Sequence, residues 1–139
     1  MLLPVSIRVN VGGSMHELPV TESILTIALR HAGEAGAARI TDVYLVIGDL
    51  SSIVDDSVQF YWDIISEGTI AAGARLHFQR LPITLLCLQC DHHYTPAQDD
   101  FACPQCGSER VKIDQGEEFY LDSVEIERED LKSEANNDD

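Results

Sequence analysis

The sequence predicts an α+β protein, with a small mixed sheet of three strands packed with two helices. A four-cysteine zinc-ribbon module is predicted as an insertion in this body. Two observations predict this class. Apolar residues recur with helical and strand periods on both sides of the cysteines. All four cysteines also lie in one short stretch, as two Cys-x-x-Cys pairs separated by twelve residues.

The 139 residues divide into four predicted parts. These are an N-terminal extension over 1–14, an α/β domain over 15–86 and 109–127, a zinc-binding module over 87–108, and a disordered acidic tail over 128–139. The tail is charged and lacks apolar anchors, which is why it is expected to stay unfolded.

The first fourteen residues differ in character from the rest of the chain. Residues 6–11 alternate as a short strand does, and Gly12-Gly13-Ser14 has the composition of a flexible joint. The segment is too short for a signal peptide and lacks a cleavage site. We consider three interpretations: an extra edge strand, a segment added to the native chain, or translation from an upstream start. The last two are favoured.

A first helix is predicted over residues 18–35. Pro19 suits its first turn, where a missing N–H costs nothing, and Gly36 favours its end. The apolar positions recur at helical spacing and form one stripe. They are Ile24, Leu25, Ala28, Leu29 and Ala32.

Residues 39–48 form the best strand pattern in the chain, with apolar side chains on both faces. We therefore expect helices or a partner to cover both faces. Asp55 or Asp56 is predicted to cap a second helix. The predicted buried face of that helix contains Val58, Tyr61, Trp62 and Ile65, widened by Phe60 and Ile64.

Two further strands complete the predicted sheet. Residues 75–86 read as one long strand, kinked near Pro82, that leads into Cys87. Residues 117–127 form the last strand. Its apolar positions change parity at Asp122-Ser123, which predicts a β-bulge.

Cys87, Cys90, Cys103 and Cys106 are the candidate ligands of a structural zinc ion. Each pair can wrap two thiolates onto one ion, and Gly107 can supply the left-handed backbone that closes such a turn. An iron site of the rubredoxin kind uses the same four thiolates, and a disulfide framework is the third possibility. Zinc is favoured. His92 and His93 are expected to face solvent, because four thiolates already fill a tetrahedral shell.

Composition restricts the function classes. The net charge of −15 comes from 24 acidic against 9 basic residues, which argues against nucleic-acid binding. It fits a protein that handles cations or docks a basic partner. No apolar run is long enough for a membrane span, so a cytoplasmic protein is expected. No catalytic triad or phosphate-binding glycine loop is visible, so an enzyme is not expected.

The motifs together resemble one family. They are Met15-His16-Glu17 before an amphipathic helix, residues 47–51 (IGDLS), residues 73–76 (GARL), the two cysteine pairs, and residues 116–127 starting with GEEF. In this order they resemble HypA/HybF, the nickel metallochaperones of [NiFe]-hydrogenase maturation. The resemblance covers roughly residues 15–127.

This resemblance implies a second metal site. Met15, His16 and Glu17 match the family's Ni(II) motif, in which the histidine next to a free amine offers imidazole, amide and amine nitrogens. Asp55 is the nearest equivalent of an acidic residue that contributes in some members. Here fourteen residues precede Met15. If they persist in the mature protein, its amine becomes an ordinary amide. Nickel is then expected to bind more weakly or with a different geometry.

The resemblance also implies partners. They are the nickel-binding GTPase HypB, the hydrogenase large subunit and, in some members, urease maturation proteins. A homodimer through the N-terminal strand is a further possibility. Two other functions stay open on the residues alone: a zinc-ribbon interaction adaptor without a nickel role, and a rubredoxin-like electron carrier.

Overall fold

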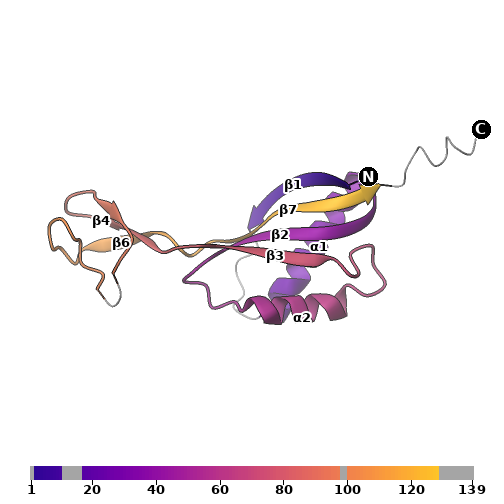
Figure 1. Cartoon of the computed structure of the whole chain (residues 1–139), viewed down its shortest axis with the longest axis horizontal. Coiled ribbons are helices and arrows are strands. Elements are labelled where there is room, and N and C mark those ends of the chain that lie inside the picture. Colours follow the sequence, from indigo (N-terminus) through magenta and orange to yellow (C-terminus); the bar gives the residue numbers. More distant parts are fainter. Residues whose placement is uncertain (1, 11–16, 98–99, 129–139) are drawn as a thin grey trace, which may run out of the picture.

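The computed structural model of the chain describes residues 2–10, 17–97 and 100–128. Two parts are visible in Figure 1, an α/β body and a smaller module joined to it by two extended segments. Among the described residues, no helix is long and apolar enough to cross a membrane. The acidic tail was predicted over 128–139; Arg128 ends the last strand, and residues 129–139 lie outside the described residues.

The body is built on a sheet of four strands in the order β1-β7-β2-β3. Their bounds are β1 Leu2–Asn10, β2 Ala37–Gly48, β3 Arg75–Leu81 and β7 Phe119–Arg128. β2 pairs with β3 in parallel and with β7 antiparallel. The predicted mixed α+β class is therefore confirmed.

The strand number differs from the predicted three, because β1 adds an edge strand. It pairs antiparallel with β7, from Leu2 opposite Glu127 to Asn10 opposite Tyr120. Its alternate residues Leu3, Val5 and Ile7 pack against the core, which explains why this segment joins the sheet. The sequence pattern predicted a strand here, and the structure shows its partner.

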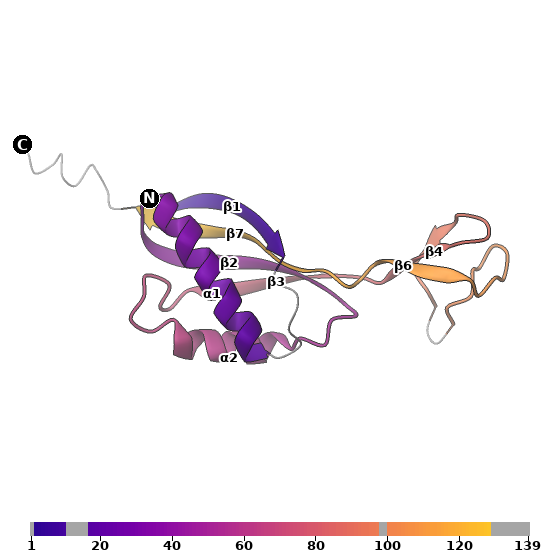
Figure 2. The ribbon, with the colours of Figure 1, turned by 180° about the vertical axis from the view of Figure 1, so that it is seen from behind.

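Both helices lie on one face of the sheet (Figure 2). Helix α1 spans Glu17–Glu34, as the apolar stripe predicted, and α2 spans Asp55–Ile65. Together with the inward face of the sheet they enclose a core that includes the fully buried Ile24, Val43 and Trp62. No described helix covers the opposite face, so the helices cover only one face of β2 (Figure 2). The alternative expectation, a partner on the other face, stays a prediction.

Helix α2 differs from its prediction in two ways. Its N-cap is Val54, which makes no side-chain cap; Asp55 and Asp56 lie inside the first turn. Its buried side chains are Val58 and Trp62. Phe60 and Ile64, expected to widen that face, are exposed, because they lie on the side of α2 that points away from the sheet.

The predicted long strand over 75–86 is two strands in two different sheets. β3 ends at Leu81, and β4 (Thr84–Cys87) begins a separate sheet of order β5-β4-β6. Pro82, which lacks a backbone donor, lies at the break. β5 is His93–Tyr94 and β6 is Val111–Gln115. Cys87 ends β4, and the other three cysteines lie in the loops that connect the strands of this second sheet.

The predicted bulge in the last strand is confirmed. Tyr44 pairs with Ser123 while the next residue, Leu45, pairs with Leu121, so Asp122 is the extra residue of β7. The bulge keeps apolar residues on the core face on both sides of it, since Leu121 and Val124 are both fully buried.

A narrow neck connects the body to the module. Gly48, at the end of β2, donates its N–H to Glu118 O at 2.7 Å, and Leu50 N donates to Gly116 O at 2.8 Å. A Cβ at position 48 would lie 2.1 Å from the carbonyl carbon and oxygen of Gly116. Only glycine allows these two segments to approach so closely.

Candidate metal centre

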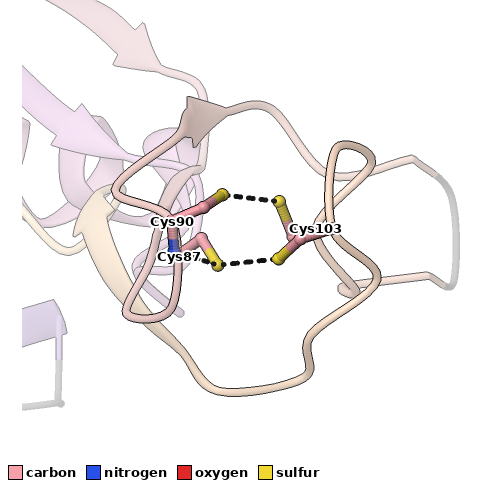
Figure 3. A group of neighbouring side chains, drawn as sticks. Cys87, Cys90 and Cys103 are labelled. Carbon is pink, nitrogen blue, oxygen red and sulfur yellow. Dashed lines mark hydrogen bonds between the residues drawn. The ribbon is translucent and has the colours of Figure 1, made fainter.

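The four cysteine sulfurs converge at the end of the module (Figure 3). All four Sγ atoms lie within 4.8 Å of one another. Cys87 Sγ is 3.6 Å from Cys106 Sγ, and Cys90 Sγ is 3.7 Å from Cys103 Sγ. A tetrahedral ion with metal–sulfur bonds of about 2.3 Å requires sulfur–sulfur edges of about 3.8 Å. All four cysteines are free, so the geometry fits one metal ion and not a disulfide framework.

The first cysteine pair sits in a tight turn after β4. Cys87 N donates to His92 O at 2.9 Å, and Cys87 O accepts from Asp91 N at 2.9 Å. Asp91 closes the turn with φ of 64°. This left-handed conformation is one that aspartate tolerates better than most residues.

The second pair repeats the same turn. Cys103 N donates to Ser108 O at 2.9 Å, and Gly107 N donates to Cys103 O at 2.8 Å. Gly107 has φ of 78°, as the sequence predicted for it. Sequence analysis missed the matching role of Asp91, although the signal was present: Asp91 follows Cys90 as Gly107 follows Cys106.

Within each turn, the first thiol accepts backbone N–H groups. Cys87 Sγ accepts from Gln89 N at 3.3 Å and Cys90 N at 3.4 Å, and Cys103 Sγ accepts from Gln105 N at 3.4 Å. Such donors stabilise a thiolate, which is the form that binds metal. The turns therefore prepare two of the four ligands for coordination.

The pKa values of the thiols differ between the first and the second cysteine of each turn. Burial raises the pKa of the Cys87 thiol, but the two N–H groups and the neighbouring thiols outweigh burial and lower it to about 7. The pKa of Cys103 is lowered in the same way. Burial raises the pKa of Cys90 to about 12, because there the neighbouring thiols act in the same direction. Some of these thiols ionise easily and others resist ionisation. A bound cation stabilises all four cysteines as thiolates.

A small apolar cluster supports the sulfurs. Leu85, Cys87, Tyr94 and Cys103 are buried together, and Tyr94 donates its hydroxyl to Phe101 O at 2.5 Å. His93 is mostly exposed and pairs with Asp114 at 3.2 Å, and His92 stacks on Tyr94. Neither histidine belongs to the four-sulfur group, in line with the sequence expectation.

The residues of the predicted nickel site are described only in part. Met15 and His16 lie outside the described residues. Glu17 is the first residue of α1, and its Oε2 accepts a hydrogen bond from Val54 N at 3.1 Å. Asp55 follows Val54 and forms an ion pair with Arg80 at 2.6 Å. The structure thus brings Glu17 to the N-terminus of α2, beside Asp55.

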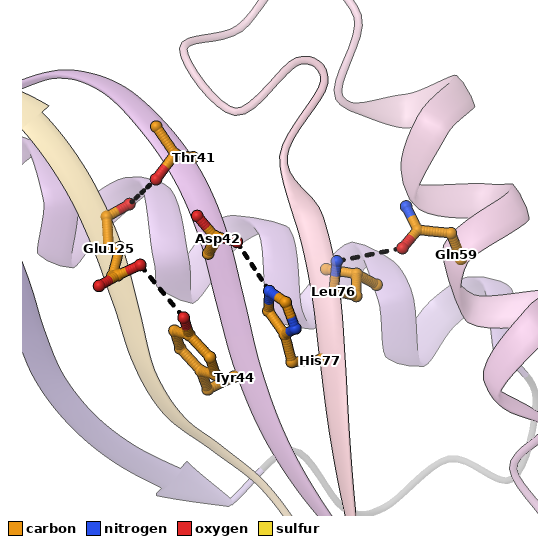
Figure 4. Close-up of polar contacts among 7 residues, drawn as sticks. All are labelled: Thr41, Asp42, Tyr44, Gln59, Leu76, His77 and Glu125. Atoms are coloured by element: carbon orange, nitrogen blue, oxygen red, sulfur yellow. Dashed lines mark hydrogen bonds and ion pairs between the residues drawn. The ribbon is translucent and has the colours of Figure 1, made fainter. Parts of the chain in front are cut away.

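A second polar cluster lies on the uncovered face of the sheet (Figure 4). His77 Nε2 is 2.7 Å from Asp42 Oδ2, the His77 ring stacks on Tyr44 at 4.6 Å, and Tyr44 donates its hydroxyl to Glu125 at 3.1 Å. The hydrogen bond to His77 lowers the pKa of Asp42, although burial opposes it. These groups are paired with one another; among the described residues, only the cysteines gather as a metal-binding group.

Comparison with known proteins identifies the family. A family profile described as hydrogenase/urease nickel incorporation, metallochaperone, hypA matches residues 15–126. The hydrogenase maturation factor HypA of Dehalococcoides mccartyi strain 195 is 38% identical over 119 residues, which cover 86% of this chain and all of that protein. The HybF factor of Salmonella typhimurium is 35% identical over 113 residues, covering 81% of this chain and all of that protein.

Solved structures agree. The chain is similar to a solution structure of HypA protein, with a TM-score of 0.67 and 31% identity, over 84% of this chain and 100% of that one. It is also similar to the solution structure of the Ni metallochaperone HypA from Helicobacter pylori, with a TM-score of 0.59 and 28% identity, over 82% and 99%. With a four-cysteine cluster on the same fold, the chain belongs to the HypA/HybF family of hydrogenase maturation metallochaperones.

Proposed function

We propose that this chain carries Ni(II) on the Met15-His16-Glu17 motif and delivers it to a [NiFe]-hydrogenase during maturation, without a catalytic step of its own. The observation that supports this proposal most directly is that the match to the nickel-incorporation family profile begins at this motif, at residue 15. The nitrogen and carboxylate groups of His16 and Glu17 suit Ni(II). HypB, as GTPase, and the hydrogenase large subunit are the proposed partners, and urease maturation proteins are further ones.

The position of Glu17 supports this proposal. The N-terminus of α2 offers Val54 N–H to one carboxylate oxygen and places Asp55 beside it. One oxygen of Glu17 is therefore held, which limits the positions of the carboxylate and supports a role in binding metal at the motif. Asp55 is a secondary candidate, because Arg80 already pairs with it at 2.6 Å.

The position of β1 determines which part of the N-terminal segment can lie near the proposed nickel site. Leu2 lies opposite Glu127, and Arg128 Nε donates to Ala35 O just after the last turn of α1. The start of β1 is therefore at the opposite end of α1 from Glu17, about 27 Å away for an 18-residue helix. While β1 keeps this place, its first residues lie away from Glu17 and cannot supply a ligand beside it.

We further propose that Cys87, Cys90, Cys103 and Cys106 hold zinc. The sulfur–sulfur distances of 3.6 and 3.7 Å support a closed tetrahedral site, which is typical of structural zinc. Reduced cysteines fit a cytoplasmic location. Elemental analysis should find one zinc per chain. A red, iron-containing protein would contradict this assignment.

Nickel titration tests the carrier function. The zinc-loaded full chain is titrated with Ni(II) by calorimetry, next to His16→Ala and a matched control, His31→Ala, in the last turn of α1. We expect one Ni(II) per chain, a loss of at least tenfold in affinity for His16→Ala, and no change for His31→Ala. A wild-type chain that binds no second divalent ion would refute the carrier function.

A second comparison tests whether a free amine on Met15 contributes to nickel binding. A chain that starts at Met15 has a free amine next to His16, whereas the full chain does not. We expect the shorter form to bind Ni(II) more tightly and with a planar nitrogen-rich absorption spectrum. Equal affinity and equal spectra would show that the amine plays no part in either form.

A further inference from the structure

The outward side of α2 carries an apolar pair between acidic residues. Asp56, Phe60, Asp63 and Ile64 occupy positions i, i+4, i+7 and i+8, which share one face of a helix. All four are exposed, with 60% of Phe60 and 53% of Ile64 open to solvent. We call these four residues the α2 stripe.

The fold does not use the α2 stripe. The core contact of α2 is made by Val58 and Trp62, which are fully buried on the other side of the helix. Phe60 packs edge-on with Tyr61, with ring centroids 5.4 Å apart. Two large apolar side chains exposed one helical turn apart are a feature of interaction surfaces, whereas isolated ones are common on any surface.

The charge around the stripe indicates what can cover it. Residues 54–67 contain four acidic residues and no lysine or arginine. Arg80 neutralises Asp55, which lies off the stripe. Asp56 and Asp63 are exposed and form no ion pair with any described residue, so their charge favours a partner that carries lysine or arginine. A second copy of this chain would set acids against acids, which disfavours a symmetric dimer through this face.

The stripe also lies close to the proposed nickel motif. Glu17 binds Val54 N at the start of α2, and Phe60 is five residues along the helix from Asp55, a rise of about 8 Å. Figure 1 shows α2 in the body and the zinc module at the far end of the two connecting segments. A protein seated on the stripe would therefore lie on the helix whose N-terminus binds Glu17.

We propose that the α2 stripe docks the protein that exchanges nickel with this chain, through apolar side chains flanked by lysine or arginine. This inference rests on the proposed nickel function for the partner's role. The acidic rim would steer such a partner and give binding a strong salt dependence. The apolar pair would supply the contact that persists in salt.

Binding measurements on three variants test the stripe. Phe60→Ala/Ile64→Ala removes the apolar pair, and Asp56→Lys/Asp63→Lys reverses the rim. Leu88→Ala/Phe101→Ala is the matched control, because these zinc-module residues are similarly exposed, at 48% and 56%. Each zinc-loaded full-length variant is titrated against HypB and against the hydrogenase large-subunit precursor by biolayer interferometry, at low and high salt. Ni(II) affinity and thermal unfolding are recorded for each variant.

We expect both stripe variants to weaken binding to at least one of these proteins by tenfold or more, with the control unchanged. Nickel affinity and thermal stability should stay as in the wild-type chain. The charge reversal should also remove most of the salt dependence. If both stripe variants bind both proteins as the wild-type chain does, the docking surface is refuted, while normal nickel binding would leave the carrier function intact. If stripe variants lose partner binding in a chain that never binds Ni(II), the surface stands and the carrier function fails.

Discussion

The four-cysteine module and the proposed nickel end of the body present two opposite ways to prepare a metal site. In the module, two nearly identical turns fix four sulfurs within 4.8 Å of one another. In the body, the described part of the proposed nickel site is one carboxylate, held by a single hydrogen bond from Val54 N. A closed site of four identical ligands keeps its ion, whereas a site with few ligands can release it. The difference fits one permanent and one transferable metal.

We expect the largest effect from removing one of the four cysteine ligands of the module. Cys87→Ser removes a ligand that two N–H groups and a buried cluster prepare. Zinc binding contributes roughly 10–16 kcal/mol in small zinc domains, far more than the few apolar contacts of this sheet. We expect loss of zinc and rapid hydrogen exchange in β4 and β6, with β2 still protected. Leu88→Ala, on an exposed side chain next to Cys87, should keep its zinc. Zinc retained in Cys87→Ser would contradict the assignment.

Acid should release this zinc as well. In the metal-free site the pKa is about 7 at Cys87 and about 12 at Cys90, and protons compete with the ion for the sulfurs. Lower pH favours the protonated, metal-free form. We expect a chromogenic chelator to extract zinc faster as pH falls below 7. A rate that does not depend on pH would argue against thiolate ligands.

The neck should be the next most sensitive place. Gly48→Ala puts a methyl group 2.1 Å from the backbone of Gly116. The clash is with backbone atoms, so the end of β2 and the segment around Gly116 have to move apart. We expect about 3 kcal/mol of destabilisation in urea unfolding. Gly33→Ala, in α1 with nothing within 4 Å of the new methyl, is the matched control and should stabilise by about 0.5–1 kcal/mol. Equal stability of the two variants would mean that the neck opens without cost.

The two regions also differ in how far the sequence predicted them. The cysteine spacing predicted the gathering of four sulfurs, since each turn is local and only two turns had to meet. The α1 stripe and the β7 bulge followed from periodicity for the same reason. The exposed Phe60 and Ile64 were mispredicted, because periodicity shows which residues share a face but not whether another element covers it.

Long-range pairing accounts for the other differences. The alternation in residues 6–11 predicts a strand but not its neighbour, so the fourth strand of the sheet came only with the structure. At Pro82 the chain passes from one sheet to another, where the sequence predicted a kink within one strand. A proline is compatible with a kinked strand and with a break between two strands, so the sequence does not separate them. The contact between Glu17 and Val54 joins residues 37 positions apart, and no local pattern indicates it.

At the nickel end, two substitutions of Glu17 separate binding from positioning. Glu17→Gln keeps an oxygen for Val54 N–H but removes the charge, and Glu17→Ala removes both. If the carboxylate binds Ni(II), both variants should lose about tenfold in affinity, and only the alanine variant should lose stability, by about 1 kcal/mol. Glu22→Gln, exposed on the same helix, is the control. Normal nickel affinity in Glu17→Gln would reduce Glu17 to a positioning residue.

The smallest effect is expected on the uncovered face of the sheet, far from both metal sites. The pKa of Asp42 is lowered from 3.8, chiefly by its hydrogen bond with His77. Because the folded state holds this carboxylate ionised to lower pH than the unfolded chain does, its stabilisation is present above about pH 4 and is lost as pH falls through the lowered pKa. The pair is partly exposed, so solvent screening limits its contribution to less than about 1 kcal/mol.

Asp42→Asn should therefore lower the free energy of unfolding slightly at pH 6, and the difference from the wild-type chain should shrink toward pH 3. Asp114→Asn provides the matched control, because its partner His93 is more exposed and 3.2 Å away, so a smaller effect is expected. Urea unfolding followed by Trp62 fluorescence, at pH values from 3 to 7, measures both. A difference that grows as pH falls would mean that Asp42 is protonated in the folded protein and that the bond with His77 does not hold its charge.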